Sequence, residues 1–137
     1  MVIDTSVLIC ILLGEPETEL FAKALAADGK RYLSSFNALE TAIVIEAKKG
    51  DPGNREFDLL LNRARIEVVS LNNRHVALAR QAWKIFGKGR HPAGLNIGDC
   101  CAYALSKAMG EPLLFKGNDF ALTDLPPVKL PNSDSDS

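Results

Sequence analysis

The sequence has little of what defines several large classes of protein. Its 137 residues include only three cysteines and 7% aromatic residues, and the formal net charge is −1. An odd number of cysteines, two of them adjacent, does not form a disulfide framework, so Cys10, Cys100 and Cys101 are expected to be free thiols in a reducing compartment. Because there is no overall basic excess, any nucleic-acid site must be local.

Long apolar runs are also absent. The run at 7–13 is far shorter than the ~20 residues that cross a bilayer. The first basic residue is Lys23, which is too late for the charged start of a secretory signal. We therefore expect a cytoplasmic protein without a membrane-spanning segment. The P-loop, HExxH and GxSxG motifs do not occur, and His75 and His91 are not at zinc-binding spacing.

What remains is an ordinary globular composition, 47% hydrophobic and 24% charged, at a length that suits one domain. We expect this domain to span 1–130 and a polar, disordered tail to span 131–137.

Short apolar strands are predicted at 1–3, 32–34, 66–70 and 113–115, with 127–130 as a candidate edge strand. Helices are predicted at 7–13, 17–27, 36–49, 56–65, 72–86 and 99–109. The glycine-rich stretch 87–98 is expected to be a loop.

The alternation of strands and helices predicts an α/β protein. The expected architecture is a three-layer α/β/α sandwich with a mainly parallel central sheet of four to five strands. In such sheets, ligands bind beyond the carboxyl ends of the strands. The polar residues that follow the strands are therefore the first candidates for a functional site.

Three aspartates occupy such positions. Asp4 follows the first strand, Asp119 follows the fourth strand, and Asp99 lies in the first turn of a helix. Each has a structural alternative, because aspartate also caps helices, complements the positive helix start and forms turns.

Glu40 is the fourth acidic candidate. Within the helix predicted at 36–49, it falls inside the apolar stripe formed by Phe36, Leu39, Ile43, Val44 and Ala47. A carboxylate on a core-facing stripe costs several kcal/mol unless it is paired, binds a metal or lies at the rim of a cleft. The alternatives are a glutamate that reaches solvent and a buried ion pair.

A parallel sheet would bring all four acids to one edge. Several carboxylates at one point repel each other, and their pKa values rise unless a cation offsets them. A cluster that offers only oxygen ligands suits Mg²⁺ or Mn²⁺.

Four segments that carry these acids resemble a PIN domain, and specifically the VapC-type toxins of bacterial toxin–antitoxin pairs. The segments are VIDTS at 2–6, SSFNALE at 34–40, LNIGDC at 95–100 and LLFKGNDF at 113–120. They occur in the family's order and span about residues 1–125. The resemblance implies a Mg²⁺- or Mn²⁺-dependent endoribonuclease that forms a homodimer and is held inactive by a cognate VapB-like antitoxin. The amphipathic helices around Phe21 and Phe57 would permit dimerisation.

The resemblance also implies roles for individual residues. Asp4, Glu40, Asp99 and Asp119 match the family's acidic positions, and Ser6 matches a hydroxyl position close to the metal. We expect Asp4 and Asp99 to be the primary ligands, and Glu40 and Asp119 to bind a second ion or position the attacking water. Many relatives carry a further acid where this chain has Gly117, and Asn118 is expected to substitute for it in part.

An RNA partner is also favoured by the placement of charge. No acidic residue occurs between Val68 and Gly98, and Lys84, Lys88 and Arg90 precede Asp99. We expect these three residues to bind RNA phosphates, although a solvated helix face is the alternative. The expected substrate is exposed single-stranded RNA, such as a tRNA or rRNA loop. Two other functions stay open, namely a phosphatase or phosphotransfer domain with Asp4 as nucleophile, and a non-catalytic RNA- or protein-binding module.

Overall fold

The structure is a computed structural model of the chain and describes residues 1–131. Its central sheet has four parallel strands, as predicted, and their order is β3-β2-β1-β4. The strands are β1 (Val2–Ile3), β2 (Arg31–Ser34), β3 (Ile66–Val69) and β4 (Leu113–Leu114). The predicted tail at 131–137 lies outside the described residues, apart from Pro131.

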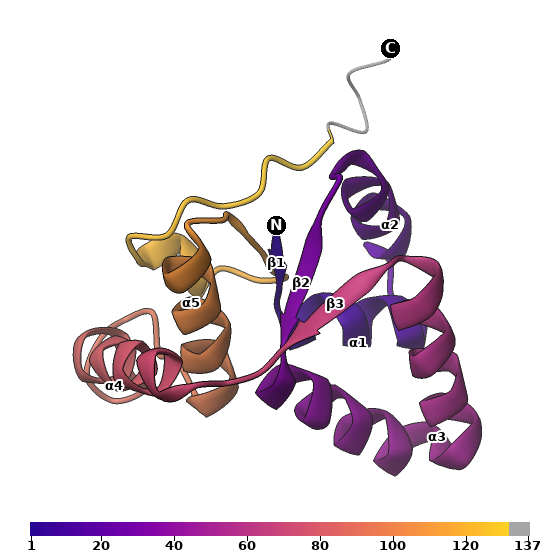
Figure 1. Cartoon of the computed structure of the whole chain (residues 1–137), viewed down its shortest axis with the longest axis horizontal. Helices are drawn as coiled ribbons and strands as arrows, with labels where there is room; N and C mark the ends of the chain where they lie inside the picture. Colours follow the sequence, from indigo (N-terminus) through magenta and orange to yellow (C-terminus); the bar gives the residue numbers. More distant parts are fainter. Residues whose placement is uncertain (132–137) are drawn as a thin grey trace.

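The helices cover the sheet on both sides, which gives the expected three layers (Figure 1). One face is covered by α1 (Thr5–Leu13), α2 (Thr18–Ala27) and α3 (Ser35–Arg63). The other face is covered by α4 (Asn73–Phe86) and α5 (Ile97–Met109), and a short 3-10 helix, η1 (Phe120–Leu122), follows β4. No helix in residues 1–131 is both long and apolar enough to cross a membrane.

The core lies on both faces of the sheet because successive side chains of a strand point in opposite directions. In β1, Val2 packs into the cluster beneath α4 and α5, whereas Ile3 packs into the cluster beneath α1, α2 and α3. Leu113 and Leu114 divide in the same way. The three cysteines are buried and free, as expected.

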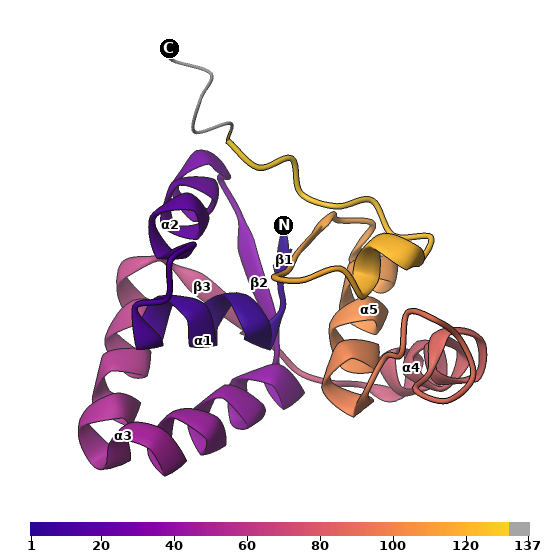
Figure 2. The ribbon, with the colours of Figure 1, turned by 180° about the vertical axis from the view of Figure 1, so that it is seen from behind.

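The helices predicted at 36–49 and 56–65 are joined more closely than expected. Residues 35–63 form one element, α3, which bends sharply at Gly50, where φ is 65° and ψ is −155° (Figure 2). Glycine adopts this left-handed backbone at little cost. Helical geometry resumes directly afterwards, and Pro52 is tolerated in that first turn because its missing N–H needs no helical partner there. The predicted end of the first helix at Gly50 is therefore confirmed, and the second helix begins directly after Gly50 instead of at residue 56.

The core-facing stripe predicted for this helix was wrong. Leu39 and Ile43 are 59% and 57% exposed. The buried stripe instead consists of Asn37, Thr41 and Ile45. Apolar spacing identified a real helical face, but that face points away from the core.

The candidate edge strand at 127–130 forms only a single bridge. Pro127 pairs with Leu113, and the Val128 N–H donates to the Leu113 carbonyl at 3.0 Å. Because Pro127 has no N–H to donate, the ladder does not continue. The segment still covers the edge of β4.

Candidate active site

The carboxyl ends of the strands and the starts of three helices meet at one edge of the molecule. Asp4 follows β1 directly and caps α1, while β2 runs into α3, which carries Glu40 in its second turn. Asp99 lies in the first turn of α5, and Asp119 lies in the loop after β4. Helix starts carry partial positive charge, which favours anionic side chains there.

Asp4 is the most deeply buried of these acids, at 3% exposed. Its Oδ2 accepts a hydrogen bond from the Ser6 N–H at 3.0 Å, so it does cap α1. Its Oδ1 is buried and has no hydrogen-bond partner. The pKa of Asp4 is raised to about 7, mainly by burial and also by the charges of Asp99 and Glu40, against the lowering effect of hydrogen bonds from Ser6. The capping role therefore occupies one oxygen and leaves the other available.

Asp99 has a similar double role. Its Oδ2 accepts from the Asn96 N–H at 3.0 Å, and its own N–H donates to Asn96 Oδ1 at 2.8 Å, which closes a capping box at the start of α5. Burial raises the pKa of Asp99 to about 6, and the charges of Asp119 and Glu40 add to the rise.

Glu40 lies at the same place, though not for the predicted reason. It is half-buried at the junction of α1, α3 and α5, where its Oε1 accepts from the Thr5 hydroxyl at 2.6 Å. Its charge raises the pKa of both Asp4 and Asp99. The structure thus brings Asp4, Glu40 and Asp99 into one electrostatic cluster.

The segment after β4 forms the outer part of this cluster. Asp119 and Asn118 are exposed, and Asp119 is close enough to Asp99 to raise its pKa. Ser6 Oγ accepts from the Lys116 N–H at 3.0 Å. Ser6 therefore connects this segment to α1.

The donor chemistry of the cluster fits a hard divalent cation. All the candidate ligands are oxygens, and Asp4 presents an unpartnered buried oxygen among like charges. Within residues 1–131, no three His, Cys, Asp or Glu side chains form a ready-made ligand group. Mg²⁺ typically keeps several waters and uses only one or two carboxylates, so the arrangement suits it.

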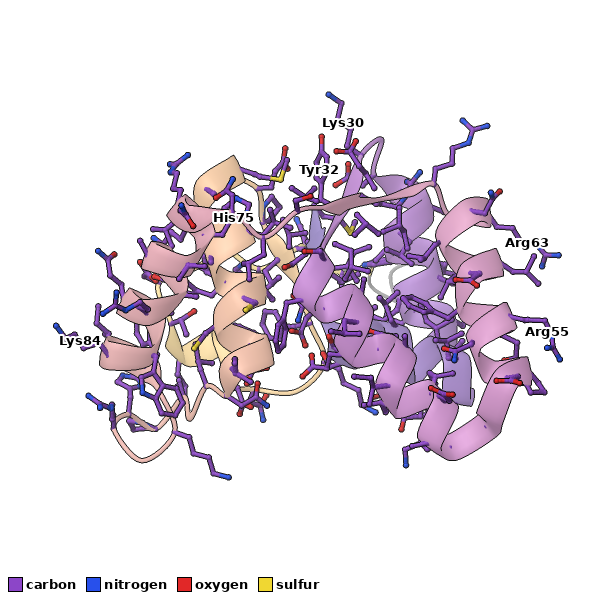
Figure 3. All side chains as sticks on the ribbon, turned by 60° about the horizontal axis from the view of Figure 1, so that its bottom comes forward. Lys30, Tyr32, Arg55, Arg63, His75 and Lys84 are labelled. Atoms are coloured by element: carbon purple, nitrogen blue, oxygen red, sulfur yellow. The ribbon has the colours of Figure 1, made fainter. Side chains whose placement is uncertain are left out.

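The predicted RNA-binding residues lie on α4 and the loop that follows it. Lys84, Lys88 and Arg90 are all exposed, and Lys84 projects outward from α4 (Figure 3). Within the described part of the chain, none of the three takes part in an ion pair. Lys84, Arg90 and Arg80 border an apolar groove between α4 and α5, whose walls include Phe36, Val76, Trp83 and Ile97.

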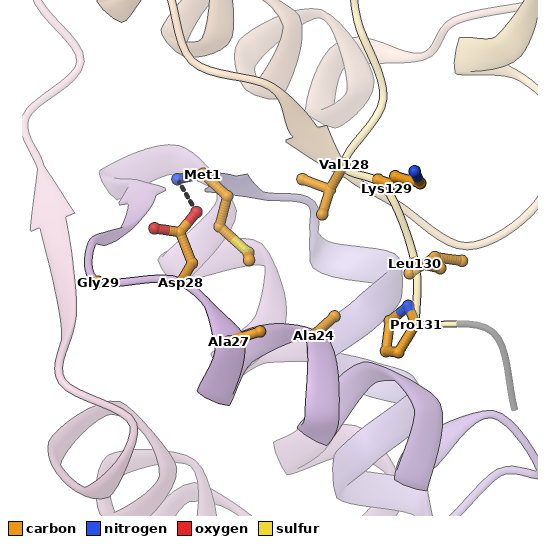
Figure 4. A pocket seen from close by; sticks show the side chains of 9 residues that line it. All are labelled: Met1, Ala24, Ala27, Asp28, Gly29, Val128, Lys129, Leu130 and Pro131. Carbon is orange, nitrogen blue, oxygen red and sulfur yellow. Dashed lines mark hydrogen bonds and ion pairs between the residues drawn. The ribbon is translucent and has the colours of Figure 1, made fainter. Parts of the chain in front are cut away.

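A second hollow lies at the opposite end of β1. It is formed by the end of α2 and residues 128–131 (Figure 4). There the amino group of Met1 donates to Asp28 Oδ2 at 3.0 Å. None of the predicted site residues lines this hollow, so it is separate from the acidic cluster.

Sequence reasoning missed three residues that hold Glu40 in place, namely Thr5, Asn37 and Gly98. Asn37 is fully buried and donates to the Gly98 carbonyl at 3.0 Å. The sequence does contain one sign of this buried polar face. Asn37 and Thr41 are both polar and lie four residues apart, so they share one side of the helix beside Glu40. Apolar periodicity does not detect such a face.

Comparison with known proteins agrees with this geometry. The family model for the PIN domain matches residues 1–125. The chain therefore belongs to the PIN domain family.

The relatives narrow this assignment. Ribonuclease VapC30 of Mycobacterium tuberculosis is 52% identical over 131 residues, which covers 96% of this chain and 100% of the relative. Ribonuclease VapC of Mycolicibacterium smegmatis is 53% identical over 128 residues, covering 93% and 99%. Within the family, the chain thus belongs with the VapC ribonucleases, which confirms the resemblance.

Solved structures show the same fold at low sequence identity. VapC20 of M. tuberculosis, described as a sarcin-ricin loop cleaving toxin, superposes with a TM-score of 0.75 at 16% identity and covers 95% of this chain and 98% of its own. VapBC2 of Rickettsia felis, bound to a DNA fragment from its promoter, gives 0.74 at 15% identity with the same coverage.

Proposed function

We propose that this protein is a metal-dependent endoribonuclease toxin whose active site is the cluster of Asp4, Glu40, Asp99 and Asp119. The observation that carries the proposal is the buried, unpartnered Oδ1 of Asp4 close to the carboxylates of Glu40 and Asp99. A bound Mg²⁺ or Mn²⁺ supplies an activated water and stabilises the leaving oxygen of a phosphodiester.

The roles we propose for the acids follow their pKa values. Asp4 and Asp99, the acids with raised pKa values, would hold the ion. Glu40 and the exposed Asp119 would position the attacking water or contact a second ion. Ser6 and Asn118 support the loop that carries Asp119, and the absence of an acid at Gly117 makes a second ion dependent on the RNA phosphate.

The substrate we propose is exposed single-stranded RNA, such as a tRNA or rRNA loop. Unstacked bases and backbone are accessible in such loops. Lys84, Lys88 and Arg90 are exposed and outside the ion pairs of the described residues, so they are available to phosphates without breaking existing contacts.

The regulator we propose is a cognate VapB-like antitoxin. Support comes from structural neighbours that are toxin–antitoxin assemblies, including a complex from Klebsiella pneumoniae that superposes with a TM-score of 0.67. We place the protein in the cytoplasm, where RNA is present and its three thiols stay reduced.

A second copy of this chain is the partner we propose for the apolar face of α3, α4 and α5. Phe36, Leu39 and Ile43 form a stripe along α3, which continues from the groove walled by Val76, Trp83 and Ile97. Five of these side chains are between 39% and 66% exposed. A self-complementary patch of this kind suits a two-fold dimer. Phe21 and Phe57, considered for this role from the sequence, are instead buried in the core.

The decisive experiment measures metal binding and RNA cleavage by purified protein with and without EDTA. The proposal expects cleavage that EDTA abolishes and Mg²⁺ restores, and an Asp99→Asn variant that folds but does not cleave. A phosphotransfer domain would instead form a phosphoaspartate at Asp4, and a binding module would bind RNA without cutting it. Full activity of Asp99→Asn would overturn the proposed site.

A further inference from the structure

The carboxylate of Glu40 is held by two neutral donors. The Thr5 hydroxyl, from the first turn of α1, donates to Oε1 at 2.6 Å. The Asn37 amide, one turn before Glu40 on α3, approaches the same oxygen at 3.4 Å. Hydroxyl and amide donors orient a carboxylate without neutralising its charge. The charge of Glu40 therefore remains available to the site.

Asn37 connects all three helix starts that surround the site. Its side chain is fully buried, and its Nδ2 donates to the Gly98 carbonyl at 3.0 Å and to Thr5 Oγ1 at 3.2 Å. Its backbone carbonyl accepts from the Thr41 hydroxyl at 2.7 Å. The amide thus fixes α1 and α5 relative to the first turn of α3.

Gly98 supplies the space in which Glu40 lies. A Cβ at position 98 would be 2.4 Å from Oε2 and 2.5 Å from Oε1 of Glu40, so any side chain there would force the Glu40 carboxylate to move. Gly98 does not have a positive φ, so its backbone conformation does not demand glycine. Glycine suits position 98 because the Glu40 carboxylate lies against the backbone there, next to Asp99.

From these contacts we propose that Thr5 and Asn37 are positioning residues for Glu40, and that Gly98 completes the arrangement by leaving room for its carboxylate. The inference rests on the proposed function, because positioning matters only if Glu40 serves the metal site. Groups that orient ligating side chains typically contribute 10- to 100-fold to metal affinity or activity. A misplacement of ~1 Å has a comparable effect on rate.

The main test compares Thr5→Val, Thr5→Ser and Thr41→Val by RNA cleavage and by Mn²⁺ affinity from electron paramagnetic resonance. Thr5→Val removes the hydroxyl at nearly constant shape and should weaken both by about 10-fold or more. Thr5→Ser keeps the donor and should behave like the wild type. Thr41→Val is the matched control, because it removes a buried hydroxyl that bonds to Asn37 but does not contact Glu40.

A Glu40→Ala background separates positioning from a general structural role. If Thr5 acts through Glu40, adding Thr5→Val to Glu40→Ala should not weaken Mn²⁺ binding further. An equal loss in both backgrounds, or wild-type Mn²⁺ affinity and cleavage in Thr5→Val alone, would overturn the positioning role while leaving the nuclease assignment intact. A wild-type protein that neither binds Mn²⁺ nor cleaves RNA would overturn both.

The role of Gly98 has its own readout, independent of metal and activity. Gly98→Ala should lower the melting temperature in EDTA, because its Cβ displaces the Glu40 carboxylate from the Thr5 hydroxyl. In the Glu40→Ala background this displacement is absent, so the same change should be nearly neutral. An equal loss in melting temperature in the two backgrounds would contradict the close approach of Glu40 to Gly98.

Discussion

The backbone N–H of Lys116 donates to the Ser6 hydroxyl at 3.0 Å and so joins two residues 110 positions apart. Ser6 lies two residues after Asp4, and Lys116 lies three residues before Asp119. This bond connects the loop that carries the outermost acid to the helix start that carries the innermost one, and the Lys116 ammonium adds ion pairs to Glu15 and Glu17. The position of Asp119 relative to Asp4 therefore depends in part on a hydroxyl at position 6.

We predict that Ser6→Ala reduces RNA cleavage more than it reduces stability. Removing a partly buried hydrogen bond costs about 1–2 kcal/mol of unfolding free energy, whereas release of the Asp119 loop disturbs the whole cluster. Urea denaturation and single-turnover cleavage in saturating Mg²⁺ measure the two effects, and Ser6→Thr serves as the control that keeps the hydroxyl. Wild-type cleavage by Ser6→Ala would show that the bond does not position Asp119.

A second prediction concerns pH and the metal-free protein. Because the pKa of Asp4 rises from 3.8 to about 7 on folding, the native state binds more protons than the unfolded state between these values. The unfolding free energy in EDTA should therefore fall as pH rises through this range, by on the order of 4 kcal/mol if Asp4 acts alone. Urea denaturation at pH 5 and pH 8 measures most of this decrease, and Mg²⁺ should reverse it at pH 8.

Asp4→Asn is the matched variant for this prediction. Asparagine keeps the cap of α1 but has no charge, so most of the pH dependence should disappear and the protein should be more stable than the wild type at pH 8 in EDTA. A smaller dependence should remain, because the pKa of Asp99 is also raised. An unchanged pH profile in Asp4→Asn would mean that the Asp4 carboxylate is not the destabilising group.

The third prediction concerns the basic residues beside the site. Replacing Lys88 and Arg90 together by alanine should weaken binding to every single-stranded RNA alike. It should also lower the salt slope of log affinity by ~0.7 for each phosphate that the protein no longer neutralises. Binding is measured in Ca²⁺ over a range of salt concentrations, with Mn²⁺ affinity as a check on the metal site.

The control for this experiment is Arg55→Ala with Arg63→Ala. Both arginines lie on α3, on the side of the molecule opposite Lys84 (Figure 3). This variant removes the same amount of charge, but its RNA affinity should keep the salt dependence of the wild type. If both double variants give the same slope, the stretch around Arg90 is only a solvated surface.

The fourth prediction concerns the exposed stripe on α3. Ile43→Lys should convert a dimer into a monomer, because a two-fold interface would then bury two unpaired lysines, one from each copy. Light scattering coupled to size exclusion gives the mass of each variant. Leu59→Lys is the control, since Leu59 is also exposed, at 51%, but lies on α3 beyond the Gly50 bend. A monomeric wild type, or loss of the dimer in Leu59→Lys instead, would contradict the proposed face.

The parallel sheet and the meeting of the acids could be predicted because both follow from local signals. Short apolar strands alternate with helices, and the acids follow strands or begin helices. The face of α3 could not be predicted, because Leu39 and Ile43 have the spacing of a core stripe whether the core or another surface covers them. Local sequence contains no information that distinguishes these two cases.

The arrangement around Glu40 was also beyond sequence reasoning. Thr5 and Glu40 are 35 residues apart, and Asn37 and Gly98 are 61 apart, so their contacts exist only after the helices have packed. The bend at Gly50 was signalled by glycine and proline, but these residues indicated a break. They did not show that helical geometry resumes at once.

Strand β1 lies between β2 and β4, and Asp4 is bonded through its N–H to the Leu114 carbonyl. During translation, Asp4 emerges from the ribosome long before Leu114 and Asp119, because it precedes them along the chain. A nascent chain therefore has an incomplete sheet and only part of its acidic cluster. If the cluster cleaves RNA as proposed, the ribosome that makes this protein, together with its tRNA and messenger, is not exposed to an assembled nuclease until the segment from Leu114 to Asp119 has emerged.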